Sequence, residues 1–309
     1  MVQTNSLKNK IIIISGPTAV GKSDLGVECA LRFGGEVVSA DSMQIYKGLD
    51  IGTGKVTQEE MKSVKHHLLD IISPDERYSV GQYLQDATVV IDDILSRGKL
   101  PIIVGGTGLY INALINGMNF SDADRSDEVR EKWKAIASEK GNEVVYEKLV
   151  EIDPVSAQKI SPNDLKRTIR AIEIFEVTGK PKSQSANTAE CKYDYIFVIL
   201  DEDREVLYER INKRVDKMFD LGLENEVKTL YNNGIDEKYQ CMQAIGYKEF
   251  FPYFKGESSL EDIKHLIKQK SRNYAKRQLT WLRTMDNIIW QDVNQENLVD
   301  HIIDQYLHN

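Results

Sequence analysis

Apolar positions along the first third of the chain follow two alternating patterns. Short buried runs at 11–15, 36–39 and 100–104 end in glycine or polar turns, as β-strands do. Longer segments with helical periodicity lie between them, at 22–33 and at 84–97, and Ser79 is placed to cap the second one. Strands that alternate with helices are typical of a parallel sheet, so the pattern predicts an α/β fold.

The pattern changes in the middle of the chain. Residues 121–178 form charged helical stretches that Pro154 and Pro162 interrupt, and 180–192 is polar and loop-like. The alternation then resumes, with a strand at 195–200, helices at 204–219, 224–232 and 259–284, and a short last strand at 288–290. We therefore expect a parallel-sheet core built from residues 1–117 and 193–309, with a helical insert at 118–192.

Charge changes this picture only locally. The chain has 309 residues, and 40 basic against 48 acidic side chains give a net charge of −8, which as a whole disfavours a nucleic-acid partner. Residues 264–283, however, contain seven basic and no acidic residues, and 155–182 carry a local charge of +3. Such stripes can hold a polyanion, although a charged helix face is more often simply solvated.

Composition also limits the setting in which the protein works. Three scattered cysteines, at 29, 191 and 241, fit neither a disulfide framework nor a zinc site, and they suit a reducing compartment. No apolar run reaches the length of a membrane span, and the first ten residues are too polar for a signal peptide. We expect a cytoplasmic protein without a membrane partner, and a monomer.

One motif carries specific chemistry. The segment between the first strand and the first helix fits the pattern G-x-x-x-x-G-K-[ST], and its residues are Gly16, Pro17, Thr18, Ala19, Val20, Gly21, Lys22 and Ser23. Its backbone N–H groups and the following helix N-terminus cradle an anion, while Lys22 adds charge and Ser23 can hold Mg²⁺. The motif predicts a phosphate site. A nucleoside triphosphate such as ATP is its usual ligand, but any diphosphate fits.

Other candidates lie just past the next strands, where ligands of open α/β sheets bind. Asp41 follows the second strand and suits a metal ligand, a general base or a turn former. Thr107 follows Gly105-Gly106 after the third strand, which is either a ligand contact or an ordinary turn. His66 and His67 are adjacent on an extended segment and point to opposite faces, which favours a structural role over a shared metal.

These motifs, taken in order, resemble the tRNA dimethylallyltransferase family over nearly the whole chain. The matching segments are Gly16–Ser23, Asp41–Tyr46, Asp50–Thr53, His66–Leu68, Tyr78–Ser79, Gly105–Thr107 with Leu109–Tyr110, Asn163–Asp164, Lys166–Arg170, Arg214 with Met218, Ile245–Tyr247, and Ala275–Gln278 with Thr280–Arg283. The chain departs from the family at Gly54-Lys55-Val56, where members usually read Ala-Lys-Pro. It also lacks the cysteines of the zinc finger that eukaryotic members carry.

The resemblance implies a P-loop NTPase-like core with a helical insertion domain that binds tRNA. It also implies transfer of a dimethylallyl group from dimethylallyl diphosphate to N6 of the adenosine 3′ of the anticodon (position 37), with Mg²⁺ as cofactor. In that case Asp41 is the general base, and Thr107 and Arg214 hold the diphosphate or organise the site. The positions that match tRNA contacts are Asp41, Ser42, Met43, Gln44, Thr107, Arg130, Lys166, Arg167, Thr168, Ile169 and Arg170.

Three alternatives stay open on the residues alone. A small-molecule P-loop kinase would share Lys22 and Ser23, but it gives no reason for a basic insert. A prenyltransferase acting on free adenine nucleotide could dispense with that insert. An RNA-binding, ATP-dependent switch would leave Asp41 and Thr107 without a task.

Overall fold

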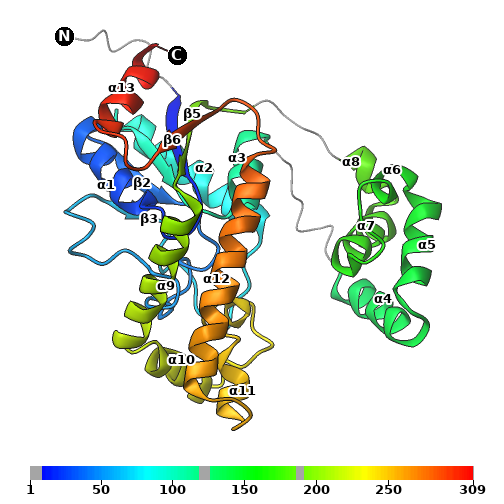
Figure 1. Cartoon of the computed structure of the whole chain (residues 1–309). Coiled ribbons are helices and arrows are strands. Elements are labelled where there is room, and N and C mark those ends of the chain that lie inside the picture. Colours follow the sequence, from blue (N-terminus) through cyan, green and yellow to red (C-terminus); the bar gives the residue numbers. More distant parts are fainter. Residues whose placement is uncertain (1–8, 118–125, 186–190, 309) are drawn as a thin grey trace. The chain divides into compact units, whose positions relative to one another are not determined.

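The computed structural model of the protein describes residues 9–117, 126–185 and 191–308. The chain divides into two compact units, one made of Met1–Ile115 and Lys192–Asn309 and the other of Asn116–Cys191. The first holds all the strands that the structure describes, and the second is helical (Figure 1). The predicted fold class, an α/β core with a parallel sheet and helical insertion, is confirmed.

A six-stranded parallel sheet forms the centre of the first unit. Its strands are β1 (Lys10–Ser15), β2 (Glu36–Ser39), β3 (His66–His67), β4 (Pro101–Val104), β5 (Asp194–Asp201) and β6 (Ile288–Asp292). They lie in the order β3-β2-β4-β1-β5-β6, and every pairing is parallel. The loops after β1, β2 and β4 therefore emerge at one edge of the sheet, which brings three predicted site segments to the same place.

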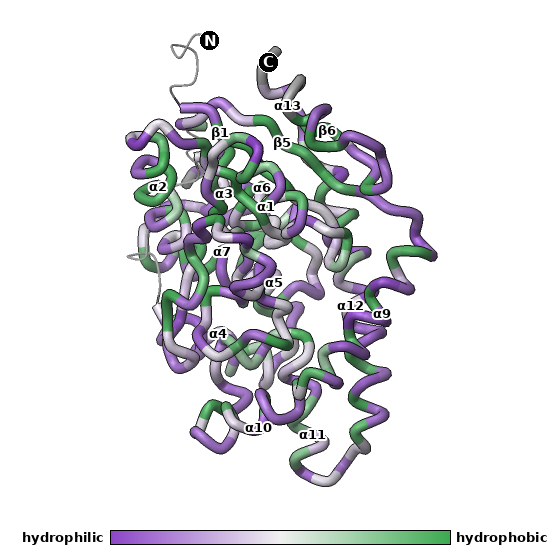
Figure 2. Tube along the Cα trace, turned by 90° about the vertical axis from the view of Figure 1, so that its left-hand side faces the viewer, coloured by the Kyte–Doolittle hydropathy of each residue, from purple (hydrophilic) through white to green (hydrophobic). Residues whose placement is uncertain are grey.

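The middle of the sheet is buried because β1, β4 and most of β5 are apolar, whereas the edge strands β3 and β6 are only partly buried. β1 is central, and Ile12 is paired with Ile102 on one side and Ile196 on the other. Alternate residues of β1, β4 and β5 share one face and form a single apolar cluster with α1 (Lys22–Phe33) and α13 (Leu298–His308). Figure 2 shows the hydrophobic stretch along β5. Continuous apolar strands of this kind are typical of sheets covered on both faces.

The helix after β3 begins four residues earlier than the sequence predicts. It is α2 (Val80–Ser96), and Ser79 is its N-cap, as expected. Ser79 accepts the N–H of Gln82, and the Gln82 side chain accepts the N–H of Ser79, so a full capping box fixes this start. α2 contacts β2, β4 and the short helix α3 (Gly108–Ile115).

Helices that follow β5 extend the first unit beyond the sheet. They are α9 (Arg204–Asp220), α10 (Leu223–Asn232), the 3₁₀ turn η2 (Cys241–Gln243), α11 (Phe250–Phe254) and α12 (Leu260–Leu282). The long helices α9 and α12 lie side by side (Figure 1). Although α12 has 23 residues, neither it nor another helix in the described ranges is apolar enough to cross a membrane.

The second unit has its own apolar core. Its helices are α4 (Asp127–Lys140), α5 (Asn142–Ile152), α6 (Pro154–Ala157), α7 (Leu165–Thr178) and α8 (Lys182–Ser185). Trp133, Val145, Leu149 and Ile172 pack together at its centre. The start of the predicted helical stretch, 121–125, lies outside the described residues. α8 occupies part of the segment that the sequence predicts to be loop, 180–192.

Candidate active site

The loop between β1 and α1 has the shape of an anion cradle. Gly16, Ala19 and Gly21 adopt left-handed φ angles of 147°, 68° and 102°, which turn the backbone back on itself ahead of α1. Successive residues of this kind direct their N–H groups into a concavity, to which the N-terminus of α1 adds a partial positive charge. Lys22 Nζ donates to the carbonyl of Pro17 at 2.6 Å, so its ammonium group lies against this loop.

Arg214, on α9, brings a second cation to the loop. Its Nη1 lies 3.3 Å from Thr18 Oγ1, and its Nη2 donates to the carbonyl of Thr53 at 2.9 Å. The pKa of Lys22 is lowered to about 7, mainly by burial and also by the nearby charge of Arg214, while the charge of Asp41 opposes the change. Burial also lowers the pKa of Arg214, while Asp41 and Glu60 act in the opposite direction. Two confined cations next to an anion cradle favour a ligand with several negative charges.

Asp41 forms a turn and still offers a carboxylate oxygen. Its Oδ1 accepts the N–H groups of Met43 at 2.8 Å and Gln44 at 3.4 Å, which is the turn-forming role considered for it. Its Oδ2 has no hydrogen-bond partner among the described residues. Burial raises the pKa of both Tyr110 and Tyr274, and the charge of Asp41 adds to the effect, so this carboxylate lies close to two aromatic side chains.

The loop after β4 connects Asp41 to α12. Thr107 Oγ1 accepts the N–H of Ser42 at 3.0 Å, which fixes the turn that carries Asp41. Gln278, on α12, donates to the carbonyl of Gly106 and accepts the N–H of Thr18, both at 2.9 Å. A Cβ at Gly106 would lie 2.3 Å from Gln278 Nε2, so any larger residue here would displace the Gln278 side chain.

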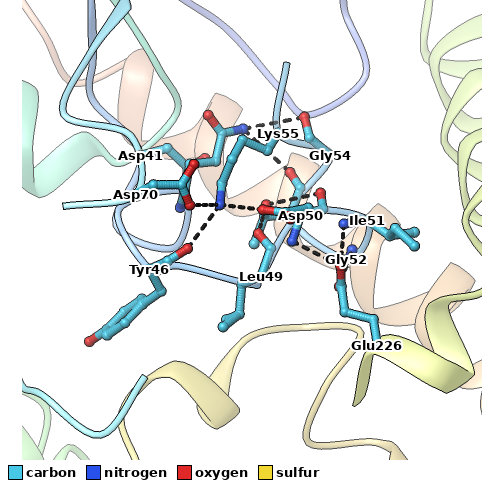
Figure 3. A network of polar contacts seen from close by, with 12 residues as sticks. Asp41, Tyr46, Leu49, Asp50, Ile51, Gly52, Gly54, Lys55, Asp70 and Glu226 are labelled. Atoms are coloured by element: carbon cyan, nitrogen blue, oxygen red, sulfur yellow. Dashed lines mark hydrogen bonds and ion pairs between the residues drawn. The ribbon is translucent and has the colours of Figure 1, made fainter. Parts of the chain in front are cut away.

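A backbone segment at 50–54 forms a further wall of the site. Lys55 Nζ bonds to the carboxylates of Asp50 and Asp70, each at 2.5 Å, and to the carbonyl of Tyr46 at 2.8 Å (Figure 3). On the opposite side, the carboxylate of Glu226 accepts the N–H groups of residues 50–52. The segment is thus fixed on both sides, and its Thr53 carbonyl is the acceptor for Arg214.

The candidate RNA-binding residues of the second unit divide into three groups. Lys166 and Arg167 are exposed at the start of α7. Arg130 and Arg170 both pair at 2.8 Å with the carboxylate of Glu173, which is completely buried.

Thr168 and Ile169 form the third group, and their side chains lie inside the unit. Thr168 Oγ1 donates to the carbonyl of Asp164, and Ile169 belongs to the apolar core. Their side chains support α7, so a contact of these two positions with tRNA, which stays a prediction, would have to use backbone atoms. The helical period explains this placement, because residues 168 and 169 share the inner face with 172.

The histidine pair forms β3, the edge strand of the sheet next to β2, away from the phosphate loop. His67 Nε2 lies 2.7 Å from the buried Glu36 carboxylate, and His66 Nδ1 lies 2.9 Å from the carbonyl of Val64. The Glu36 carboxylate also accepts hydrogen bonds from the side chains of Arg97 and Lys99. The two rings therefore bond to different partners, within the packing around β2.

Sequence reasoning gave no role to two side chains that organise the site. Gln278 stands within a motif quoted above, but its partners are backbone groups 172 and 260 residues away in the chain. From the sequence, Glu226 is an ordinary exposed acid in the first turn of α10, and its backbone partners lie 174–176 residues away. Only the tertiary fold brings these groups together.

Comparison with known proteins agrees with this geometry. The family model described as IPP transferase matches residues 44–285, and a second, described as isopentenyl transferase, matches residues 9–76. A tRNA dimethylallyltransferase of Caldanaerobacter subterraneus is 52% identical over 286 residues, covering 91% of each chain. One of Oceanobacillus iheyensis is 48% identical over 98% of this chain and 97% of its own.

Solved structures give the same result. The full-length tRNA isopentenylpyrophosphate transferase of Bacillus halodurans superposes with a TM-score of 0.72 at 44% identity, over 97% of this chain and 95% of that one. A eukaryotic dimethylallyltransferase acting on tRNA superposes with a TM-score of 0.83 at 34% identity, over 97% of this chain and 77% of its own. Because the family model matches most of the chain and these relatives are about half identical to it over nearly its full length, this chain belongs to the IPP transferase family.

Proposed function

We propose that this protein transfers a dimethylallyl group from dimethylallyl diphosphate to N6 of the adenosine 3′ of the anticodon in tRNA, with release of diphosphate. The observation that carries the proposal is the meeting of the P-loop, Lys22, Arg214 and Asp41 at one edge of the sheet. An anion cradle beside a carboxylate suits a reaction in which one substrate loses a diphosphate and the other loses a proton. Family membership supports the same reaction.

The cradle acts on the leaving group. As the bond between the allylic carbon and oxygen breaks, the electron pair stays on the diphosphate and its negative charge increases. Backbone N–H groups of the P-loop, the Lys22 ammonium and the Arg214 guanidinium stabilise that charge more strongly than they stabilise the bound substrate. A guanidinium can bind two phosphate oxygens at once, which orients the diphosphate as well as neutralising it.

Mg²⁺ fits beside this cradle with few protein ligands. Ser23 is exposed at the start of α1, and its hydroxyl makes no hydrogen bond among the described residues. The described residues contain no group of three metal-ligating side chains, so Ser23, diphosphate oxygens and water would hold the ion, as Mg²⁺ in phosphate sites prefers. When bound, the ion neutralises part of the diphosphate charge.

Asp41 acts on the acceptor. The lone pair of adenine N6 is delocalised into the ring, which makes this nitrogen a weak nucleophile. Asp41 Oδ2 accepts a hydrogen bond from N6, orients it toward the allylic carbon and takes one proton as the C–N bond forms. Oδ1 keeps its bonds to Met43 and Gln44, so the turn holds the base in place during the reaction. Ser42, Met43 and Gln44 then lie next to the target nucleotide.

Basic surfaces of both units would bind the RNA. An adenosine stacked in an anticodon loop must be flipped out to reach Asp41, and contacts with neighbouring phosphates offset that cost. In the second unit Lys166, Arg167, Arg130 and Arg170 present positive charge. On α12 the exposed face carries Lys270, Lys276, Arg277 and Arg283 without an acidic residue between them.

The same proposal includes a monomeric enzyme that works in the cytoplasm, where tRNA is found. Cys29 and Cys241 are buried as free thiols, which suits a reducing compartment. Sedimentation of the purified protein with and without tRNA tests the oligomeric state.

A comparison of acceptors tests the reaction. With Mg²⁺ and dimethylallyl diphosphate present, we expect diphosphate release to require an anticodon stem-loop with adenosine 3′ of the anticodon. Release with free AMP or ATP at equal efficiency would favour the nucleotide prenyltransferase instead. Phosphorylation of a small molecule by ATP, with no prenyl transfer, would favour the kinase.

A further inference from the structure

We propose that Glu226 is a positioning residue for Arg214 and acts on it through the backbone segment 50–54. The inference rests on the proposed function, in which Arg214 binds the diphosphate. It assigns a task to a side chain on α10 that touches neither substrate. The geometry carries the argument in two steps, from Glu226 to the segment and from the segment to the guanidinium.

The first step is a carboxylate whose bonding capacity is fully used. Glu226 Oε2 accepts the N–H of Asp50 at 2.9 Å and that of Ile51 at 2.7 Å. Its Oε1 accepts the N–H of Gly52 at 3.0 Å and the hydroxyl of Tyr247 at 2.6 Å. Figure 3 shows the carboxylate directed at the backbone nitrogens of this segment. Four donors on two oxygens fix the carboxylate and the segment together, and bonds to an ionised acceptor are stronger than neutral ones.

Tyr247 is a firm support for this arrangement. Its side chain is completely buried, and its hydroxyl donates to Glu226. Burial, with the adjacent charge of Glu226, raises the pKa of Tyr247 well above its ordinary value, so the hydroxyl keeps its proton and stays a donor. The Tyr247 hydroxyl thus fixes the carboxylate through one hydrogen bond, and the other three bonds of the carboxylate go to the backbone of the segment.

The second step leads from the segment to Arg214. The carbonyl of Thr53, the next residue, accepts Arg214 Nη2 at 2.9 Å, and Thr53 Oγ1 donates back to the carbonyl of Leu49 at 2.6 Å. Gly54 follows with a left-handed φ of 59°, and a Cβ there would lie 2.0 Å from Arg214 Nη2. The guanidinium therefore occupies the space that a side chain at residue 54 would fill.

These contacts define where the guanidinium lies. On one side it rests on Thr53 and Gly54, and on the other its Nη1 reaches Thr18 of the P-loop. If the segment shifts, the guanidinium loses its contact with either Thr53 or Thr18, and its orientation toward the proposed diphosphate site changes. Displacements of about 1 Å at a positioning group can cost a hundredfold in rate.

The test measures binding of inorganic diphosphate in the presence of Mg²⁺ by calorimetry. We expect Glu226→Gln to weaken this binding roughly tenfold and to leave tRNA binding unchanged, because an amide loses the charge and offers only one acceptor atom. The control is Glu224→Gln on the same helix, whose side chain accepts only the hydroxyl of Tyr253 and should leave both affinities unchanged.

A double variant separates positioning from simple support of the fold. If Glu226 acts through Arg214, adding Glu226→Gln to Arg214→Gln should weaken diphosphate binding no further. Additive losses would overturn the proposal, as would an unchanged diphosphate affinity in folded Glu226→Gln.

A third variant covers the case in which Glu226→Gln does not fold. Tyr247→Phe leaves α10 intact and removes one of the four donors that hold the Glu226 carboxylate, so it should produce a smaller loss of diphosphate affinity with the same selectivity. Wild-type affinity in Tyr247→Phe would contradict the proposal. The readout requires no prenyl transfer, so failure of the proposed function would show separately, as diphosphate binding without a modified tRNA.

Discussion

In the proposed mechanism Asp41 combines two tasks in one side chain, since Oδ1 forms a turn and Oδ2 accepts the substrate proton. Asp41→Asn keeps an acceptor for the Met43 N–H but removes the base. We predict that its single-turnover rate falls between about a hundredfold and ten thousandfold, the range typical of general bases, with tRNA and diphosphate affinities retained. The exposed Asp75→Asn serves as the matched control. Normal turnover in Asp41→Asn would remove the base from the mechanism.

Lys22 predicts a specific pH dependence. Burial lowers its pKa to about 7, so in the free protein its ammonium group loses its proton as the pH rises through 7. A diphosphate prefers the protonated form, and its affinity should therefore fall between pH 6 and 8.5, by up to about tenfold per unit above 7 from this group alone.

Lys22→Arg isolates the lysine in that experiment. Arginine stays charged over the whole range, so the variant's pH profile of diphosphate affinity reports only the ionisation of the ligand. Calorimetry on both proteins measures the difference, and the wild type should take up a proton on binding at pH 8. Parallel profiles for the two proteins would show that Lys22 is charged throughout.

The helix α7 separates two kinds of basic residue. Lys166 and Arg167 are exposed, whereas Arg170 pairs with the buried Glu173. We predict that Lys166→Gln with Arg167→Gln weakens tRNA binding and reduces the slope of log affinity against log salt by about 0.7–0.9 for each lost phosphate contact. Filter binding at several salt concentrations measures this slope.

The control in that experiment is Lys140→Gln, at the exposed end of α4 in the same unit. A salt slope that stays at the wild-type value in the double variant would mean that RNA phosphates bind elsewhere. Arg170→Gln is a poorer test, because it also removes a partner of a buried carboxylate and so affects stability.

Local sequence signals predicted most elements of the sheet unit. α1 and β2 have the predicted bounds because a glycine pair ends the helix and a short apolar run follows it. The elements of this unit that were not predicted are the helices α3, α11 and α13, the 3₁₀ turn η2 and the two-residue β3. α11 has five residues with a proline among aromatic side chains, and β3 exists only through its pairing with β2. Such elements depend on tertiary contacts that propensity does not contain.

The candidate site could be predicted only in part for the same reason. The P-loop is a contiguous motif, so its spacing alone indicated the anion cradle, and Lys22 and Ser23 with it. Glu226 and Gln278 bond to backbone groups far away in the chain, and a bond to the backbone leaves no sequence signal at the partner position. Thr168 and Ile169 show the opposite case, in which a matching motif includes residues that serve the helix core.

At the scale of the whole molecule, Glu36 at the start of β2 links the end of α2, the loop before β4 and the strand β3. Its carboxylate is 2% exposed and bonds to Arg97, Lys99 and His67. The hydrogen bonds from Arg97 first, and then from Lys99 and His67, hold the pKa of Glu36 far below its usual range. This stabilisation is present above the pKa of the unfolded chain, near 4.3, and is lost as the pH falls toward the depressed value.

We predict that Glu36→Gln lowers the free energy of unfolding of the sheet unit by about 3 kcal/mol at pH 7, the scale for breaking a buried ion pair. The difference from wild type should shrink below pH 4. Hydrogen exchange of peptides from β1 and β4 measures it, with the exposed Glu28→Gln as control. Equal protection of wild type and variant at pH 7 would show that the network contributes nothing.

Transfer of a prenyl group to tRNA is the central claim, and mass spectrometry of the product tests it most directly. The wild-type protein is incubated with Mg²⁺, dimethylallyl diphosphate and an anticodon stem-loop, and the RNA is digested and sequenced by mass. The account predicts a gain of one C₅H₈ unit on the adenosine 3′ of the anticodon, with one diphosphate released for each. An unmodified stem-loop, or a C₅H₈ unit on another nucleotide, would contradict it.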